Sequence, residues 1–322
     1  MKAIVVHECG GPEQMRFEDA PMPAVGAGQA RVKLSYSGVN FIDIYFRMGL
    51  YKADLPMIVG QEACGVVESL GEGVTEVAVG DRVAYAGPRG SYAEYAVVPA
   101  WQLVKVPTGV TDSLAAAAML QGMTAHYLTH STFPLQQGQT CLVHAAAGGA
   151  GQCIVQMAKR RGARVIATVG SEAKAELARE AGADEVILYD QVDFAAETRR
   201  LTEGKGVDVV YDSVGASTFT KSIDSLKPRG MMVTFGNASG PVPAVEPLLL
   251  SAKGSLFLTR PTLAHHVATR EELLWRAGDV LSWIANGDLR LRVHKTYALS
   301  EAREAQEDLA SRKTTGKLLL AV

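Results

Sequence analysis

The sequence predicts an α/β protein in which a doubly wound parallel sheet is joined to a second, antiparallel β domain. Three observations predict it. Six short apolar runs rich in Val and Ile recur between residues 140 and 259. Helix-like segments separate the first five runs, and this alternation is typical of a parallel sheet covered on both faces. Before about residue 123 the segments are short and broken by Gly and Pro, as in antiparallel sheets.

The expected elements follow in chain order. We expect strands at 140–145, 164–169, 185–189, 207–212, 231–235 and 255–259, and helices at 151–161, 172–181, 193–203 and 217–226. Two further helical segments, 270–286 and 300–311, precede the apolar end "KLLLAV". This tail has too few elements to form a domain alone. We therefore expect residues 262–322 to complete a first domain, 1–123, and residues 124–261 to form a nucleotide-binding domain.

Composition narrows the class of protein. The chain has 322 residues and is 48% hydrophobic, which is ordinary for a globular protein of two domains. A formal net charge of -2 gives no electrostatic reason to expect nucleic acid as a partner. The start "MKAIVVHECGGPE" is no signal peptide, and no apolar run is long enough to span a membrane. The four cysteines lack disulfide or zinc-lobe spacing, which favours a reducing, cytoplasmic location.

A glycine-rich turn lies between the first expected strand of the parallel sheet and its helix. The segment "HAAAGGAGQ" places Gly148, Gly149, Ala150 and Gly151 in this turn. Bare backbone lets a pyrophosphate approach closely, and the free N–H groups of the helix start can bind it. The spacing from Ala146 is A-x-G-x-x-G, so alanine replaces the first glycine of the dinucleotide fingerprint. We expect a dinucleotide cofactor here, and the alternative is a tight structural turn.

The end of the second strand indicates which dinucleotide. NAD-binding domains carry an acidic residue there for the ribose 2′-hydroxyl. Here the sequence has Gly170 and Ser171 instead, and Lys174 follows in the first helical turn, where the helix dipole disfavours a cation. A 2′-phosphate explains this lysine, so we expect NADPH, with Tyr189 of the next strand beside the phosphate. The alternative is a solvated lysine that tolerates a penalty of about 0.3–1 kcal/mol.

The whole chain resembles one known family. The segments that carry the resemblance are "VNFIDIYFRMGLY" (39–51), "GDRV" (80–83), "HAAAGGAG" (144–151), "VYDSVG" (210–215), "FGNASG" (235–240) and "SLFLTRP" (255–261). Together they are similar to NADPH:quinone oxidoreductase, in the zinc-free, ζ-crystallin-like branch of the medium-chain dehydrogenase/reductase superfamily. The resemblance implies a GroES-like β-barrel domain built from both chain ends, a Rossmann domain, and a cleft between them.

Zinc is not expected. Zinc-dependent relatives place a cysteine near the position of Asn40 and a G-H-E motif at 60–62, where this sequence has "GQE" with Gln61. A catalytic zinc needs about three protein ligands, and amides are poor substitutes. The sequence therefore predicts metal-free hydride transfer.

The expected catalytic segment is "NFIDIYFRMGLY". A quinone is already electrophilic, so a hydrogen-bond donor near its oxygen is enough to stabilise developing charge. Tyr45 and Tyr51 are the candidates, with Asn40 and Asp43 on the same segment. The resemblance implies that Asn40 lies near the nicotinamide and both tyrosines near the substrate. The alternative is that the tyrosines pack at the edge of the barrel, and no dedicated acid–base residue is assigned.

The resemblance also implies further cofactor contacts. Besides the glycine turn and the phosphate site, the residues expected at the cofactor are Asn40, Thr124, Tyr127, Ser213, Phe235, Gly236, Asn237, Thr259 and Arg312. On sequence alone each of them is an ordinary loop or strand-end residue.

The leading prediction is a zinc-independent, NADPH-dependent quinone reductase. The alternatives are an enoyl or alkenal double-bond reductase, and a cofactor-binding protein with a crystallin-like or RNA-binding role. Near-zero net charge makes RNA the weaker of these. The expected partner is a small electrophile such as a quinone. The apolar strand near 255–260 is expected to be an edge, and family and pattern together predict that a homodimer covers it.

Overall fold

The computed structural model describes all residues, 1–322. Its contacts divide the chain into two compact units. The first unit combines Met1–Met123 with His266–Val322, and the second is Thr124–His265, which ends a little beyond the expected position 261. Each unit is described by itself.

The second unit contains the parallel sheet. Its strand order is β11-β10-β9-β12-β13-β14, and each neighbouring pair is parallel. This order is that of a doubly wound dinucleotide-binding sheet, with its switch point between β9 and β12. The strands are β9 (Thr140–His144), β10 (Arg164–Val169), β11 (Glu185–Leu188), β12 (Val207–Asp212), β13 (Leu226–Thr234) and β14 (Phe257–Thr259). The predicted parallel sheet is confirmed.

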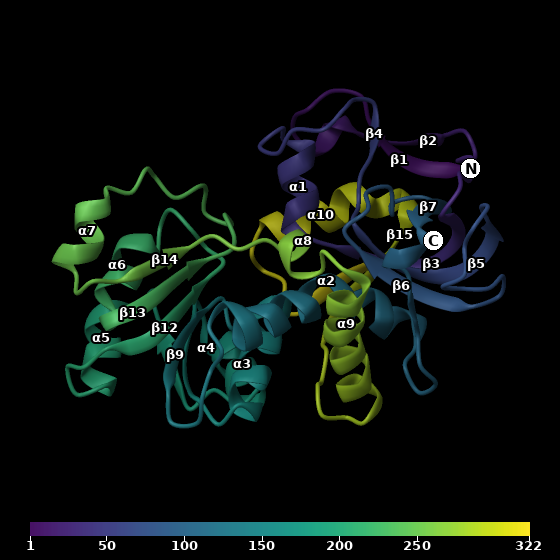
Figure 1. The fold of residues 1–322 in the computed structure, drawn as a ribbon. Coiled ribbons are helices and arrows are strands. Elements are labelled where there is room, and N and C mark those ends of the chain that lie inside the picture. The colour runs from purple at the N-terminus through teal and green to yellow at the C-terminus, as the bar shows by residue number, and fades with distance from the viewer. The chain divides into compact units, whose positions relative to one another are not determined.

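Helices cover both faces of this sheet. They are α3 (Gly149–Arg160), α4 (Glu172–Glu180), α5 (Phe194–Leu201) and α6 (Phe219–Asp224). Two short helices, α7 (Pro247–Ala252) and α8 (Leu263–His266), also belong to this unit. The helices α3 and α4 pack on one face, and α5 and α6 on the other (Figure 1). The central strand β12 is covered on both faces, and all six of its residues are buried, including Asp208 and Asp212 among the apolar ones.

The first unit is built around antiparallel strands from both ends of the chain. Its strands are β1 (Lys2–Val6), β2 (Met15–Asp19), β3 (Gln29–Val39), β4 (Met57–Ile58), β5 (Glu62–Leu70), β6 (Arg82–Ala86), β7 (Tyr95–Pro99), β8 (Val104–Lys105), β15 (Val293–Ala298) and β16 (Lys317–Ala321). The larger sheet has the order β15-β16-β3-β5-β6-β8, with β7 also paired to β3. The smaller sheet is β2-β1-β4.

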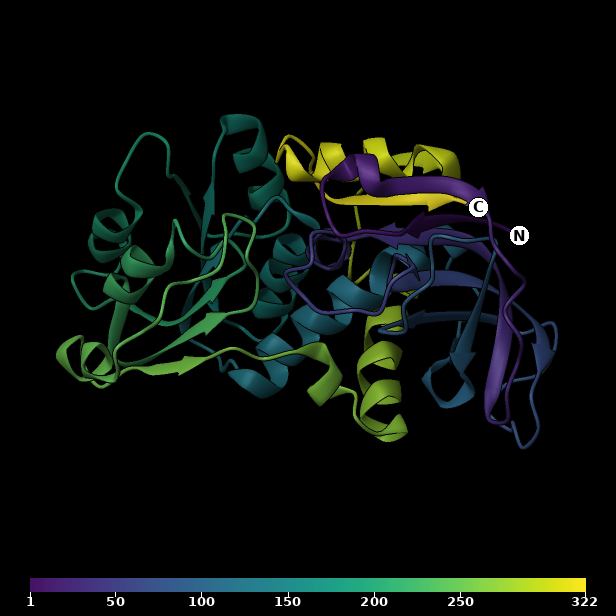
Figure 2. The ribbon, with the colours of Figure 1, turned by 90° about the horizontal axis from the view of Figure 1, so that it is seen from above.

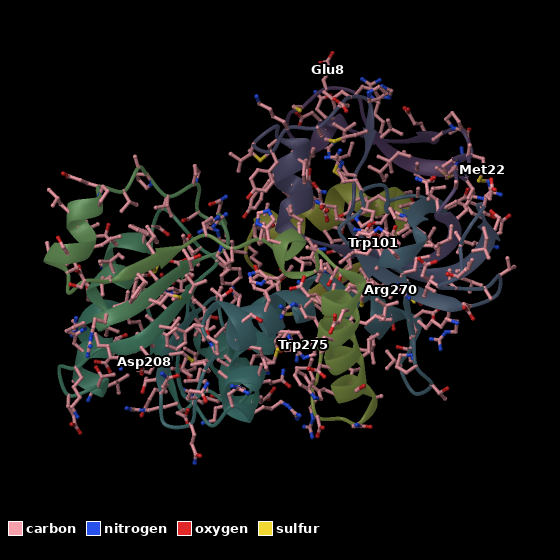
Figure 3. All side chains as sticks on the ribbon, viewed as in Figure 1. Glu8, Met22, Trp101, Asp208, Arg270 and Trp275 are labelled. Carbon is pink, nitrogen blue, oxygen red and sulfur yellow. The ribbon has the colours of Figure 1, made fainter.

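The C-terminal tail completes this first unit. Strand β16 pairs antiparallel with β3, with Leu318 opposite Val39, and β15 pairs with β16. Figure 2 shows the yellow C-terminal strand beside the purple strands of the chain start. Helix α9 (Arg270–Ala285) is tied to the same unit, because the Arg270 guanidinium donates to the Trp101 carbonyl at 2.5 Å (Figure 3). Helices α1 (Phe41–Arg47) and α10 (Ala302–Ala310) also belong to this unit.

Helix α2 (Asp112–Tyr127) has no counterpart among the expected elements. The run Ala115–Ala118 is almost completely buried, and the helix is apolar around its circumference. An amphipathic period marks only helices with one exposed face, so this buried helix gives no such signal. No helix, α2 included, combines the length and apolarity that crossing a membrane requires.

Candidate functional site

The turn between β9 and α3 is a close-packed cradle of backbone. A Cβ atom at Gly151 would lie 2.3 Å from the Ala145 carbonyl oxygen and 2.8 Å from the Ala146 Cα atom. Only glycine therefore allows the helix to begin so close to the strand. The first helical hydrogen bond runs from Gln152 N to Gly148 O (2.9 Å). The amides of residues 149–151 precede this bond, and such amides are the groups that bind phosphate at helix starts.

The end of β10 lies beside the end of β11. Val169 is opposite Leu188, and the Tyr189 hydroxyl lies where a side chain at Gly170 would have to go, 2.7 Å from an ideal Cβ. Ser171 caps α4 by accepting a hydrogen bond from the Lys174 amide (3.4 Å). Burial lowers the pKa of Lys174, and the charge of Asp190 opposes this effect. The structure thus brings the four residues expected at the phosphate together, with Asp190 as an unexpected neighbour.

The loops after β12 and β13 are packed against each other. A Cβ atom at Gly236 would lie 2.3 Å from the Ser213 carbonyl oxygen, so this glycine permits the contact. Phe235 N donates to the Asp212 carbonyl at 2.8 Å. Ser213, Phe235, Gly236 and Asn237 therefore gather at the carboxyl ends of neighbouring strands, where doubly wound sheets bind their ligands.

Arg260 joins this group and was missed from the sequence. It follows β14, and its guanidinium donates to the Gly236 carbonyl at 3.0 Å. In the amide orientation that satisfies both side-chain atoms, Asn237 accepts from Arg260 at 3.1 Å and donates to the Gly236 carbonyl at 3.0 Å. Arg260 lies within the quoted segment "SLFLTRP". A cation directly after an apolar strand was the available signal.

A buried polar chain connects three strand ends, and sequence reasoning missed it too. His144 contacts the Thr168 hydroxyl through Nδ1 at 2.7 Å and the Ser222 hydroxyl through Nε2 at 2.9 Å. The Ser222 hydroxyl donates to Asp212 at 3.1 Å, so the proton of the neutral imidazole must lie on Nε2. Burial lowers the pKa of His144, which keeps the ring neutral.

The carboxylate at the end of that chain shapes the loop after β12. Asp212 accepts hydrogen bonds from Val214 N (2.8 Å) and Gly215 N (3.0 Å). The polar chain therefore fixes the loop that carries Ser213 relative to the ends of β9 and β10. Polar residues at or near the last positions of apolar strands were the signal for His144, Thr168 and Asp212.

The remaining expected cofactor residues are Thr124, Tyr127, Thr259 and Arg312, of which Thr259 lies opposite Val233, close to the loop after β13. Thr124 and Tyr127 are buried on α2, with 9% and 2% exposure, and Thr259 ends β14. Arg312 is exposed in the turn after α10, with a left-handed φ of 59°. Contact of these four residues with a cofactor stays a prediction.

In the first unit, Asn40 belongs to a buried charged cluster. Lys317 Nζ donates to Glu62 Oε2 (2.5 Å) and to Asn40 Oδ1 (2.6 Å), and Asn40 Nδ2 donates to Glu62 Oε2 (2.9 Å). The Leu120 amide donates to the other Glu62 oxygen at 2.6 Å. Lys317 and Glu62 are 2% and 0% exposed. A Cβ atom at Gly38 would lie 2.2 Å from Glu62 Oε2, so glycine makes room for the pair.

Asp43 is buried next to this cluster. Its carboxylate accepts from the Asn40 amide (2.9 Å) and from the Tyr92 hydroxyl (3.0 Å) at the start of α1. Burial raises the pKa of Asp43 to about 7. Asn40 and Asp43 thus have internal partners that fix the start of the helix. A catalytic role for either residue stays a prediction.

Tyr45 and Tyr51 lie together at the far end of α1. Their rings meet edge to face with centroids 5.6 Å apart, and both are half-buried. Tyr51 N donates to the Tyr45 carbonyl at 3.3 Å, because the chain turns back after the helix. The structure therefore unites the two phenols that the sequence analysis singled out.

No group of three or more His, Cys, Asp or Glu side chains is arranged to hold a metal ion. The positions compared with zinc ligands are occupied by two buried amides, Asn40 and Gln61.

Matches to known proteins cover both units. Residues 26–108 match a family model described as alcohol dehydrogenase GroES-like domain, and residues 149–273 one described as zinc-binding dehydrogenase. A quinone oxidoreductase of Pseudomonas aeruginosa is 46% identical over 99% of each chain. A 2-haloacrylate reductase of a Burkholderia species is 43% identical over 99% of this chain and 98% of the relative. A mycobacterial protein solved in complex with NADPH shares 47% identity over 100% of both chains, with a TM-score of 0.97.

Proposed function

The chain belongs to the quinone oxidoreductase family of the medium-chain dehydrogenases/reductases, and from this premise we propose that it reduces quinones with NADPH. The observation that supports the proposal most is the pair of residues that follows the end of β10. Ser171 and Lys174 offer a hydroxyl and a cation there, where NAD-specific domains carry an acid.

The residues present fit the cofactor. Gly148 and Gly151 keep the turn after β9 free of bulky side chains, and the amides of residues 149–151 precede the first helical hydrogen bond. These groups would hold the pyrophosphate, and Lys174 with Ser171 and Tyr189 the 2′-phosphate. The loop held by Asp212 would support the remaining part of the cofactor. NADPH, when bound, supplies a hydride.

The protein itself would position the quinone and stabilise the charge on its oxygen. A quinone that gains a hydride needs one proton to become a hydroquinone. We assign the donor role near that oxygen to the phenols of Tyr45 and Tyr51, which lie together at the end of α1. Solvent supplies the net proton, because no dedicated acid is assigned.

The direct test is oxidation of NADPH by a simple quinone, with and without a chelator. We expect turnover in both cases, since no metal site is required. Activity that chelation removes and zinc restores would contradict the metal-free mechanism. A reducing, cytoplasmic location stays a prediction, and none of the four cysteines forms a disulfide.

Removing one phenol should slow the reaction without abolishing it. We expect Tyr45→Phe or Tyr51→Phe to lower kcat/KM for a quinone by about tenfold, or about 1.4 kcal/mol. NADPH binding should change little. Full activity in both variants would show that the tyrosines only pack together. Loss of nearly all activity in a folded variant would identify an essential proton donor.

Reduction of an activated carbon–carbon double bond is the second candidate function. The observation that favours it is the 43% identity to a relative named 2-haloacrylate reductase. Both reactions need only a hydride and a proton, so the two substrates must be compared directly.

The edge strand β14 is the surface that we propose for a homodimer. It pairs with β13 alone, and Phe257 on it is 58% exposed. An exposed apolar edge of this kind invites pairing with a second strand. Light scattering should give twice the mass of the 34.2 kDa chain. Phe257→Glu should favour the monomer, and a wild-type monomer at working concentration would contradict the proposal.

A further inference from the structure

Asp190 lies in the part of the second unit that we assign to the 2′-phosphate. It follows Tyr189 directly after β11, beside the end of β10. An ideal Cβ at Gly170 would lie 3.2 Å from Asp190 Oδ2 and 2.7 Å from the Tyr189 hydroxyl. The carboxylate and the phenol therefore converge over the same bare backbone, one residue before the helix cap Ser171.

The charge of Asp190 acts on the same lysine that we assign to the phosphate. The charge of Asp190 opposes the lowering of the Lys174 pKa by burial. Both charges thus act within the first turn of α4. An anion that enters this turn meets an attractive ammonium group and a repulsive carboxylate at once.

On the basis of the proposed function, we propose that Asp190 is a specificity-determining residue that opposes Lys174 and narrows the preference for NADPH over NADH. The 2′-phosphate carries between one and two negative charges, whereas the 2′-hydroxyl of NADH carries none. The carboxylate therefore weakens the binding of NADPH but not that of NADH. Lys174 gives the protein its preference for NADPH, and Asp190 reduces the ratio of the affinities for NADPH and NADH.

The repulsion between Asp190 and the 2′-phosphate should be as weak as that between two exposed charges. Asp190 is solvent-exposed, so water screens the repulsion. Two charges a few ångströms apart in water change an equilibrium constant by about fivefold. Salt near 1 M shortens the screening length to about 3 Å, which should nearly abolish the effect.

The experiment is a titration of the purified full chain with NADPH and with NADH at low and high salt. Asp190→Asn should lower the Kd for NADPH by about fivefold at low salt and change the Kd for NADH by less than twofold. The matched control is Glu180→Gln, which removes an exposed carboxylate from the other end of α4 and should leave both constants unchanged.

A second experiment, in the Lys174→Ala variant, distinguishes direct repulsion of the phosphate by Asp190 from an indirect effect of Asp190 on Lys174. In Lys174→Ala, the added Asp190→Asn should still tighten the binding of NADPH, because the carboxylate would repel the phosphate directly. An unchanged NADPH constant in Asp190→Asn, equal changes for both cofactors, or no effect in the Lys174→Ala background would each overturn the inference. Failure of the proposed function would show differently, since the wild-type protein would then bind no NADPH.

Discussion

Lys174→Ala should weaken binding of NADPH by roughly 10- to 150-fold and leave binding of NADH nearly unchanged. Only NADPH offers the 2′-phosphate, and a charge-assisted hydrogen bond contributes on the order of 1.5–3 kcal/mol. Ser171 and Tyr189 remain near the phosphate position in the variant. Some preference for NADPH should therefore survive.

The Kd values for both cofactors check this prediction. Lys205→Ala is the matched control, because Lys205 is an exposed lysine of the same unit, paired with Glu203 before β12. Lys205→Ala removes the same charge as Lys174→Ala. However, Lys205 lies before β12, whereas the proposed cofactor site is at the ends of the strands. Equal losses for NADPH and NADH in Lys174→Ala would show that this lysine does not recognise the phosphate.

Lys317→Met should destabilise the protein by about 3–5 kcal/mol, because it leaves Glu62 buried without its counter-charge. Glu62 would keep only neutral donors, the Asn40 amide and the Leu120 N–H. For a unit of this size the melting temperature should fall by roughly 6–20 °C.

Two further variants test the cause. Adding Glu62→Gln to Lys317→Met should recover part of the lost stability, since a buried neutral pair avoids the uncompensated charge. Lys295→Met removes an exposed ion pair with Glu304 and should cost at most about 1 kcal/mol. Thermal unfolding measures all three. If Lys317→Met melts like Lys295→Met, the buried pair does not stabilise the first unit as described.

The parallel sheet could be predicted from the sequence because each of its elements carries a local signal. The run 164–169 was expected as a strand and is β10, and the segment 172–181 was expected as a helix and is α4 apart from its last residue. Helix α2 was missed, since a helix that is buried on all sides has no amphipathic period. The strand β15 was missed as well; it pairs on one side only and is mostly exposed.

The candidate site also contains residues that a local motif reveals and contacts that only the fold reveals. Gly151, Ser171 and Lys174 belong to a strand–turn–helix motif, so their spacing reveals them. Two long-range contacts behind Asn40 and Ser213 could not be predicted, because the residues that form them are distant in the sequence. Lys317 meets Glu62 across 255 residues, and His144 meets Ser222 across 78. Only the folded chain places these groups together.

One steady-state measurement tests whether the protein is a quinone reductase that uses NADPH. NADPH oxidation by the wild-type protein should be followed with a simple quinone, a 2-enal and a 2-haloacrylate under the same conditions. We expect the highest kcat/KM with the quinone, and faster turnover with NADPH than with NADH. A kcat/KM that is higher for either alkene, or no NADPH oxidation with any of the three, would contradict this expectation.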